Sequence, residues 1–257
     1  MIKVILPAAL LLGLLAVSCS VSVSPRSRAL IVSTGLDYTE CTVNDLHGTV
    51  DDAKEVALCL SKIYANMGIE SEVQVITSCT AVELMSVLRE LAPTENDVFI
   101  FYWSGHGHVD KDGMFLVTYP DGSQAYSRFY VSDLCEFTEG LCCPSVIILD
   151  ACYAGRPVFE GPPLTKTAIL ASCSADELSM VTHIRTVEGT VQAHSIFTAA
   201  LLEVLGWQHS VDLTGFLGFM PPRMTAADLG EEIRQKLGRT SQHPVFGRTD
   251  VPVLIVP

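Results

Sequence analysis

Apolar positions along the chain follow two spacings, one typical of buried strands and the other of helices. Strands covered on both faces are predicted by four continuous apolar runs, at residues 29–34, 97–103, 145–149 and 168–172. Shorter strands are predicted at residues 73–76 and near 251–256. Apolar residues spaced about 3.6 apart predict a helix over residues 50–67, which Gly68 ends. Further helices are predicted over residues 80–91, 195–205 and 225–237.

This alternation of strands and helices indicates an α/β fold with a mostly parallel central sheet flanked by helices. Ligands of such sheets bind where the strands end. A capping-box pair, Thr80 and Glu83, marks the start of one helix. Residues 155–167 hold two glycines and three prolines, so we expect a flexible connection open to cleavage there.

Composition excludes two classes of protein. Of the 257 residues, 49% are hydrophobic and 18% are charged, which is typical of a folded chain and not of a disordered one. The 29 acidic residues outnumber the 16 basic ones and give a net charge of −13. A net negative charge repels phosphate groups, so nucleic acid is not an expected partner.

The amino terminus has the layout of an export signal. Residues 4–17 form an apolar run of 14 residues that contains Pro7, well short of the roughly 20 that a membrane-spanning helix needs. Lys3 precedes the run and small residues follow it, which predicts a signal peptide over residues 1–18. The sequence LAVSC at residues 15–19 resembles a bacterial lipobox.

The lipobox resemblance implies that Cys19 is lipidated and becomes the first residue of the mature protein. Residues 19–28 would then form a short tether to one domain over residues 29–257, and the lipid would be its only link to a membrane. The alternative is an ordinary signal peptide cleaved near Ser20. Either reading predicts an exported protein, anchored at a bacterial cell envelope in the first case and periplasmic or secreted in the second.

The nine cysteines do not indicate a disulfide framework. Setting aside Cys19 and one reactive thiol leaves an odd number, and the chain has no CxxC spacing that would suit zinc. We therefore expect most of them to be small buried hydrophobic residues, and we expect no metal site.

Two predicted strands deliver a histidine and a cysteine to the same edge of the sheet. The motif YWSGHG at residues 102–107 ends in His106 and Gly107, and IILDACYAG at residues 147–155 contains Cys152. A thiol attacks a carbonyl as a thiolate, so it needs a nearby imidazole and backbone N–H groups for the oxyanion. We therefore predict His106 and Cys152 as catalytic residues, with an oxyanion hole formed by the N–H groups of Gly107 and Cys152.

These two motifs resemble those of the caspase and metacaspase cysteine peptidases, and the 46 residues from 106 to 152 agree with the family spacing of roughly 50. Three further segments are similar to the family in the right order: LHGTVDDA at residues 46–53, AILASCSADE at 168–177 and HSIFTAALL at 194–202. A fourth, QHPVF at 242–246, resembles the closing strand region. The chain departs at Ala151 and Tyr153, where metacaspases commonly have serine and histidine. The resemblance implies a caspase-like three-layer sandwich.

The resemblance also implies the substrate. Asp52 and Asp150 match the acidic pocket residues of metacaspases, which implies cleavage after Arg or Lys. The alternative is that Asp52 stabilises a helix start and Asp150 a turn. We expect His108 to be a solvated loop histidine.

Together these features predict a cysteine endopeptidase acting on protein or peptide substrates through an acyl-enzyme. The competing hypothesis is a caspase-like binding or scaffold lipoprotein that has lost turnover. We expect no cofactor. The acidic residues between the two motifs are too scattered to indicate a calcium site, and residues 110–113 read as a hairpin turn.

Overall fold

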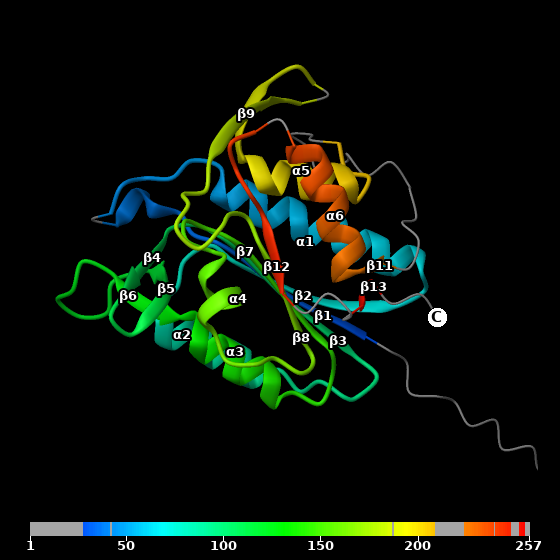
Figure 1. Cartoon of the computed structure of the whole chain (residues 1–257), viewed down its shortest axis with the longest axis horizontal. Coiled ribbons are helices and arrows are strands. Elements are labelled where there is room, and N and C mark those ends of the chain that lie inside the picture. Colours follow the sequence, from blue (N-terminus) through cyan, green and yellow to red (C-terminus); the bar gives the residue numbers. More distant parts are fainter. Residues whose placement is uncertain are drawn as a thin grey trace, which may run out of the picture.

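The computed structural model describes residues 28–41, 43–186, 188–208, 224–238, 240–247 and 252–254, and Figure 1 shows their arrangement. A six-stranded sheet has the order β12-β8-β7-β3-β1-β2, with β12 antiparallel to its neighbour and the other pairs parallel. Its strands are β1 (Arg28–Gly35), β2 (Glu70–Ile76), β3 (Val98–Ser104), β7 (Ser145–Asp150), β8 (Thr167–Ala171) and β12 (Val245–Gly247). The predicted mixed, mainly parallel sheet is confirmed.

Helices cover both faces of this sheet and make three layers (Figure 1). One face carries α1 (Thr49–Asn66), α5 (Ile196–Val204) and α6 (Ala226–Leu237), and the other carries α2 (Ala81–Glu90) and α3 (Val131–Gly140). Side chains of a strand point alternately to the two faces. On β3, Ile100 and Tyr102 accordingly join the core under α1, whereas Phe101 and Trp103 join the core under α2 and α3.

Smaller elements surround the carboxyl edge of the sheet. A three-stranded sheet consists of β4 (Gly107–Asp110), β5 (Gly113–Thr118) and β6 (Ser127–Tyr130). The hairpin of β9 (Val181–Arg185) and β10 (Val191–Ser195) extends away from the body in Figure 1. The remaining elements are η1 (Tyr38–Glu40), α4 (Arg156–Glu160), β11 (Met224–Thr225) and β13 (Pro252–Leu254).

Most predicted elements lie within a residue or two of the observed ones. The Thr80 hydroxyl accepts from the Glu83 N–H and the Glu83 carboxylate accepts from the Thr80 N–H, so the capping box that starts α2 is confirmed. The hairpin turn at residues 110–113 is also confirmed, because Asp110 pairs with Gly113 between β4 and β5.

Three expectations differ from the structure. The connection at residues 155–167 begins with α4, which Pro157 can start because its missing N–H is not needed in a first helical turn. His108 is exposed as expected, but it lies on β4 rather than in a loop. The described part of the last predicted strand, β13, pairs with β11 in a separate two-stranded sheet, whereas β12 closes the central sheet where the segment at residues 242–246 resembles the closing strand region.

The predicted signal peptide, the tether up to residue 27 and Cys19 lie outside the described residues. Within the described part of the chain, no helix is long and apolar enough to cross a membrane. Five cysteines are buried thiols outside any disulfide, as expected of small core residues: Cys59, Cys79, Cys135, Cys143 and Cys173.

Candidate active site

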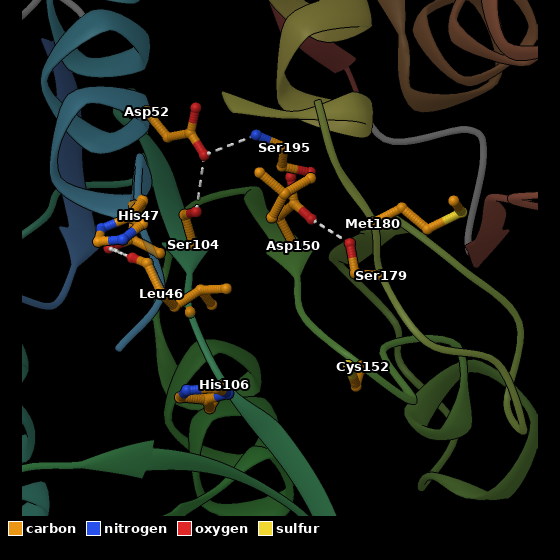
Figure 2. A pocket seen from close by; sticks show the side chains of 13 residues that line it. Leu46, His47, Asp52, Ser104, His106, Asp150, Cys152, Ser179, Met180 and Ser195 are labelled. Atoms are coloured by element: carbon orange, nitrogen blue, oxygen red, sulfur yellow. Dashed lines mark hydrogen bonds between the residues drawn. The ribbon is translucent and has the colours of Figure 1, made fainter. Parts of the chain in front are cut away.

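A pocket opens at the carboxyl edge of the central sheet, where β3 and β7 end. His106, Cys152, Asp52 and Asp150 all line it, so the structure brings the four predicted side chains together. Figure 2 shows His106 and Cys152 on opposite sides of one end of this pocket, with Asp52 and Asp150 at the other end. Parallel strands end on one edge of a sheet, which is why residues far apart in the sequence meet here.

A backbone carbonyl fixes the imidazole of His106. Its Nε2 lies 2.7 Å from the carbonyl oxygen of Asn44, and its backbone N–H donates to the hydroxyl of Tyr38. The Tyr38 ring also packs against the imidazole edge to face, with ring centroids 4.7 Å apart. A carbonyl oxygen can only accept, so neutral His106 carries its proton on Nε2 and keeps a lone pair on Nδ1.

Cys152 lies two residues after the end of β7, on a constrained turn. The next residue, Tyr153, has a φ of 63°, a left-handed conformation that costs a non-glycine residue energy. Its N–H donates to the carbonyl of Glu177 at 2.8 Å, which holds the turn in place. The two motifs that contain His106 and Cys152 also touch, since a Cβ added to Gly107 would lie 2.5 Å from the Cys152 carbonyl oxygen.

The surroundings of Cys152 favour its protonated thiol over the thiolate. Burial raises its pKa above the ordinary value, the backbone of Ser179 opposes this by hydrogen bonding, and the charge of Asp150 raises it further. A thiolate must therefore be generated by proton transfer to a neighbouring base.

The carboxylate of Asp52 is almost completely buried in the first turn of α1. Its Oδ1 lies 2.7 Å from Nδ1 of His194, and its Oδ2 accepts from the Ser104 hydroxyl at 2.9 Å and from the Ser195 N–H at 3.3 Å. Burial raises the pKa of Asp52 to about 6, although its contacts with His194 oppose the shift.

Backbone geometry lets Asp52 reach this position. The helix begins after Gly48, whose φ of 94° suits glycine, and a Cβ there would lie 2.2 Å from the carbonyl oxygen of Ala193. Only a glycine lets the start of α1 approach β10 this closely. The Asp52 N–H then closes the first helical turn by donating to the Gly48 carbonyl at 2.8 Å.

Asp150 is also buried, but its partners are neutral. Its Oδ1 accepts from the Ser179 hydroxyl at 2.7 Å, and its Oδ2 accepts from the hydroxyl and N–H of Thr198 at 2.6 and 3.2 Å. Burial raises the pKa of Asp150, and the hydrogen bonds from Ser195, Thr198 and Ser179 oppose the shift. Among the ion pairs between described residues, none includes Asp150.

Sequence reasoning did not single out several residues that shape the site. Asn44 and Ser179 lie in segments without periodicity, so no local pattern points to them. His194 and Thr198 were visible only as members of a family-like segment at residues 194–202. Across the described residues, no group of three or more His, Cys, Asp or Glu side chains is arranged to hold a metal ion.

A comparison with protein families identifies this architecture. A family model described as a caspase domain matches residues 26–253. The chain belongs to the caspase domain family. Membership indicates a cysteine peptidase with protein substrates, and it accounts for the α/β sandwich and for the six segments of similarity. No curated protein matches the chain.

The close approach of Gly107 to Cys152 predicts a mutational effect in this caspase domain. We expect Gly107→Ala to lower kcat/KM by roughly 100-fold, because the new Cβ would displace the Cys152 backbone and small misplacements of reacting groups are costly. Peptide hydrolysis by the purified variant measures this. Gly140→Ala is the control, since nothing lies within 4 Å of a Cβ there. Equal activity of the two variants would contradict the tight contact.

Proposed function

We propose that this caspase domain is a cysteine endopeptidase that cleaves after Arg or Lys, with His106 and Cys152 as its catalytic dyad. The observation that carries the proposal is the shared pocket, which holds the imidazole, the thiol and two buried carboxylates. A protein that only binds basic ligands would not need an imidazole and a thiol facing the same pocket.

The proposed reaction begins with the neutral dyad. Nδ1 of His106 takes the proton of the Cys152 thiol, and Nε2 keeps its hydrogen bond to the Asn44 carbonyl, which stabilises the resulting imidazolium. The thiolate attacks the peptide carbonyl carbon, and the N–H groups of Gly107 and Cys152 stabilise the oxyanion. His106 then protonates the leaving amine, and water hydrolyses the acyl-enzyme. No cofactor enters these steps.

The negative charge at the end of the pocket away from His106 and Cys152 favours binding of a basic substrate side chain. The hydroxyl and N–H donors of Asp150 leave its negative charge unbalanced, because they are neutral. A guanidinium or ammonium group would supply that balance through charge-assisted hydrogen bonds. An aspartate side chain would instead be repelled by the two carboxylates.

A set of fluorogenic peptides that differ only at the residue before the scissile bond tests the proposal. We expect Arg and Lys peptides to be cleaved and Asp peptides to be left intact. Faster cleavage after Asp would overturn the specificity. Failure to cleave any of the peptides, with Cys152 reduced, would favour the alternative, a caspase-like binding lipoprotein without turnover.

We propose further that the protein is exported and held at a bacterial cell envelope by a lipid on Cys19. The apolar run at residues 4–17 and the LAVSC segment that ends in Cys19 support this. Diacyl modification of one cysteine would keep an acidic domain at a membrane surface.

A cysteine substitution tests the anchor. We expect Cys19→Ser to abolish lipid attachment and to move the protein from the detergent phase to the aqueous phase, while Cys142→Ser, a change at an exposed thiol, leaves partitioning unchanged. Intact mass of the protein purified from membranes measures the modification. A mature chain that starts at a residue other than Cys19 would refute the lipobox reading.

A further inference from the structure

A histidine that takes no part in the proposed proton transfer lies buried behind the substrate pocket. His194, on β10, is 0% exposed, and both of its ring nitrogens face acidic residues of α1. Its Nδ1 lies 2.7 Å from Oδ1 of Asp52, and its Nε2 lies 3.9 Å from Oε1 of Glu55. Both carboxylates are as buried as the imidazole, with 1% and 0% of the residue exposed.

The buried groups around His194 carry an excess of acidic side chains. Three carboxylates, Asp52, Glu55 and Asp150, are buried at or behind the pocket. A protonated His194 would offset one of these negative charges, and buried charges are costly unless they are paired. Glu55 also accepts a hydrogen bond from Trp207 Nε1 at 2.7 Å.

The groups around His194 favour its cationic form. Burial lowers the pKa of His194, but the hydrogen bond and charge of Asp52, together with the charges of Glu55 and Asp51 on the same helix, outweigh burial and raise it. Two further ionisable groups lie on the pocket side of Asp52. The charge of Asp150, on β7, raises the pKa of Asp52. Tyr102, on β3, is a neutral phenol whose pKa is raised well above its ordinary value.

We propose that His194 is a positioning residue whose protonated imidazole donates a hydrogen bond to Asp52 and holds this carboxylate ionised at the pocket wall. This inference rests on the proposed function, because it explains how the pocket keeps its charge for a basic side chain. With Oδ1 bound to His194, the Asp52 carboxylate is oriented so that Oδ2 faces Ser104 and Ser195, which line the pocket. With Asp52 paired to His194, Asp150 is the pocket carboxylate whose negative charge is left to face a basic substrate residue.

The proposal predicts a pH dependence with a definite sign. A carboxylate attracts a cation only when it is ionised, so binding of basic ligands weakens as the pH falls through the pKa of Asp52, about 6. The hydrogen bond and charge of His194 lower the pKa of Asp52 and so oppose the effect of burial. If the charge of His194 is lost, the pKa of Asp52 therefore rises. An opposite charge at this range shifts a pKa by about 1 to 3 units.

His194→Gln isolates the charge, because a glutamine side chain can still donate one hydrogen bond to Asp52. We expect its KM for Arg peptides at pH 6.5 to rise about tenfold or more, with kcat little changed, and the loss to shrink above pH 8. In an Asp52→Asn background the same substitution is expected to have no further pH-dependent effect. His183→Gln, a change at an exposed histidine of β9, is the matched control.

A binding measurement separates this inference from the proposed function. Benzamidine, a mimic of the Arg side chain, is titrated into the protein by calorimetry between pH 5 and 9, which needs no turnover. We expect its affinity to fall below pH 6 in the wild type, and we expect the midpoint of this fall to lie at higher pH in His194→Gln. A loss of affinity that is uniform across pH would show a merely structural role for His194 and overturn the inference.

NMR of the histidine rings covers the case in which His194→Gln does not fold. In the wild type we expect the His194 imidazole to remain protonated through pH 7, and in Asp52→Asn we expect it to lose that proton at lower pH. A neutral His194 at pH 6 in the wild type would overturn the inference. Peptide cleavage without basic preference, together with a protonated His194, would refute the proposed specificity alone.

Discussion

Cys152→Ala is expected to lower peptide hydrolysis by at least about 10⁴-fold, because the substitution removes the nucleophile and with it the acyl-enzyme. The thiol is only partly buried and the change removes one sulfur atom, so thermal unfolding should be little altered. Turnover of Arg and Lys peptides by the purified variant measures the effect. The matched control is Cys142→Ala, a substitution of an exposed thiol that is outside the pocket.

The same peptide-hydrolysis assay tests the proposed general base, His106. His106→Ala should cause a loss nearly as large, since the raised pKa of Cys152 keeps the thiol protonated and a protonated thiol is the weaker nucleophile. His183→Ala, at an exposed position of β9, should retain activity. Wild-type turnover in Cys152→Ala would refute the peptidase mechanism. Substantial activity in His106→Ala alone would point to another base, for which His108 is the first candidate.

The second large effect is expected at the specificity pocket. Asp150→Asn should lower kcat/KM for Arg and Lys peptides by roughly 30-fold or more, because removing one partner of a buried, hydrogen-bonded charge pair typically costs about 2 to 5 kcal/mol. The amide oxygen can still accept from Thr198, and the amide nitrogen can donate to Ser179, so the local structure should be retained. Peptides that carry citrulline in place of arginine measure the charge contribution directly.

Citrulline keeps the shape of arginine without its charge, so the preference for Arg over citrulline should shrink in Asp150→Asn. Asp112→Asn, an exposed change on the hairpin between β4 and β5, is the control. An equal loss on Arg and citrulline peptides would show that Asp150 supports the fold of the pocket and does not recognise charge.

The sequence by itself determined the elements and their order. Uninterrupted apolar runs such as residues 97–103 predicted strands covered on both faces, because only a sheet between two layers of helices buries every side chain of such a strand. The capping box at Thr80 located the start of α2 because it is a contact between neighbours in the sequence. His106 and Cys152 were predicted for a similar reason, since each lies two residues after a buried strand and such strands end at one edge of the sheet.

Local patterns could not predict elements whose pairing depends on distant residues. Strand β9 alternates exposed and half-buried positions, but β10 passes from exposed to buried positions, and neither strand shows a regular alternation of apolar residues in the sequence. Strand β12, of three residues, is too short to show a period, so only the family resemblance of residues 242–246 pointed to it, and its pairing with β8 is a tertiary contact.

Only the tertiary structure decided the surroundings of the four predicted side chains. His194 reaches Asp52 across 142 positions of sequence, and Thr198 reaches Asp150 across 48. Asn44 reaches His106 across 62 positions through its backbone carbonyl, a group that every residue has and that no sequence pattern can distinguish. The pKa values of Asp52 and Cys152 follow from burial and from such partners. The sequence shows which ionisable groups are present, but desolvation and charge pairing in the folded state set their protonation.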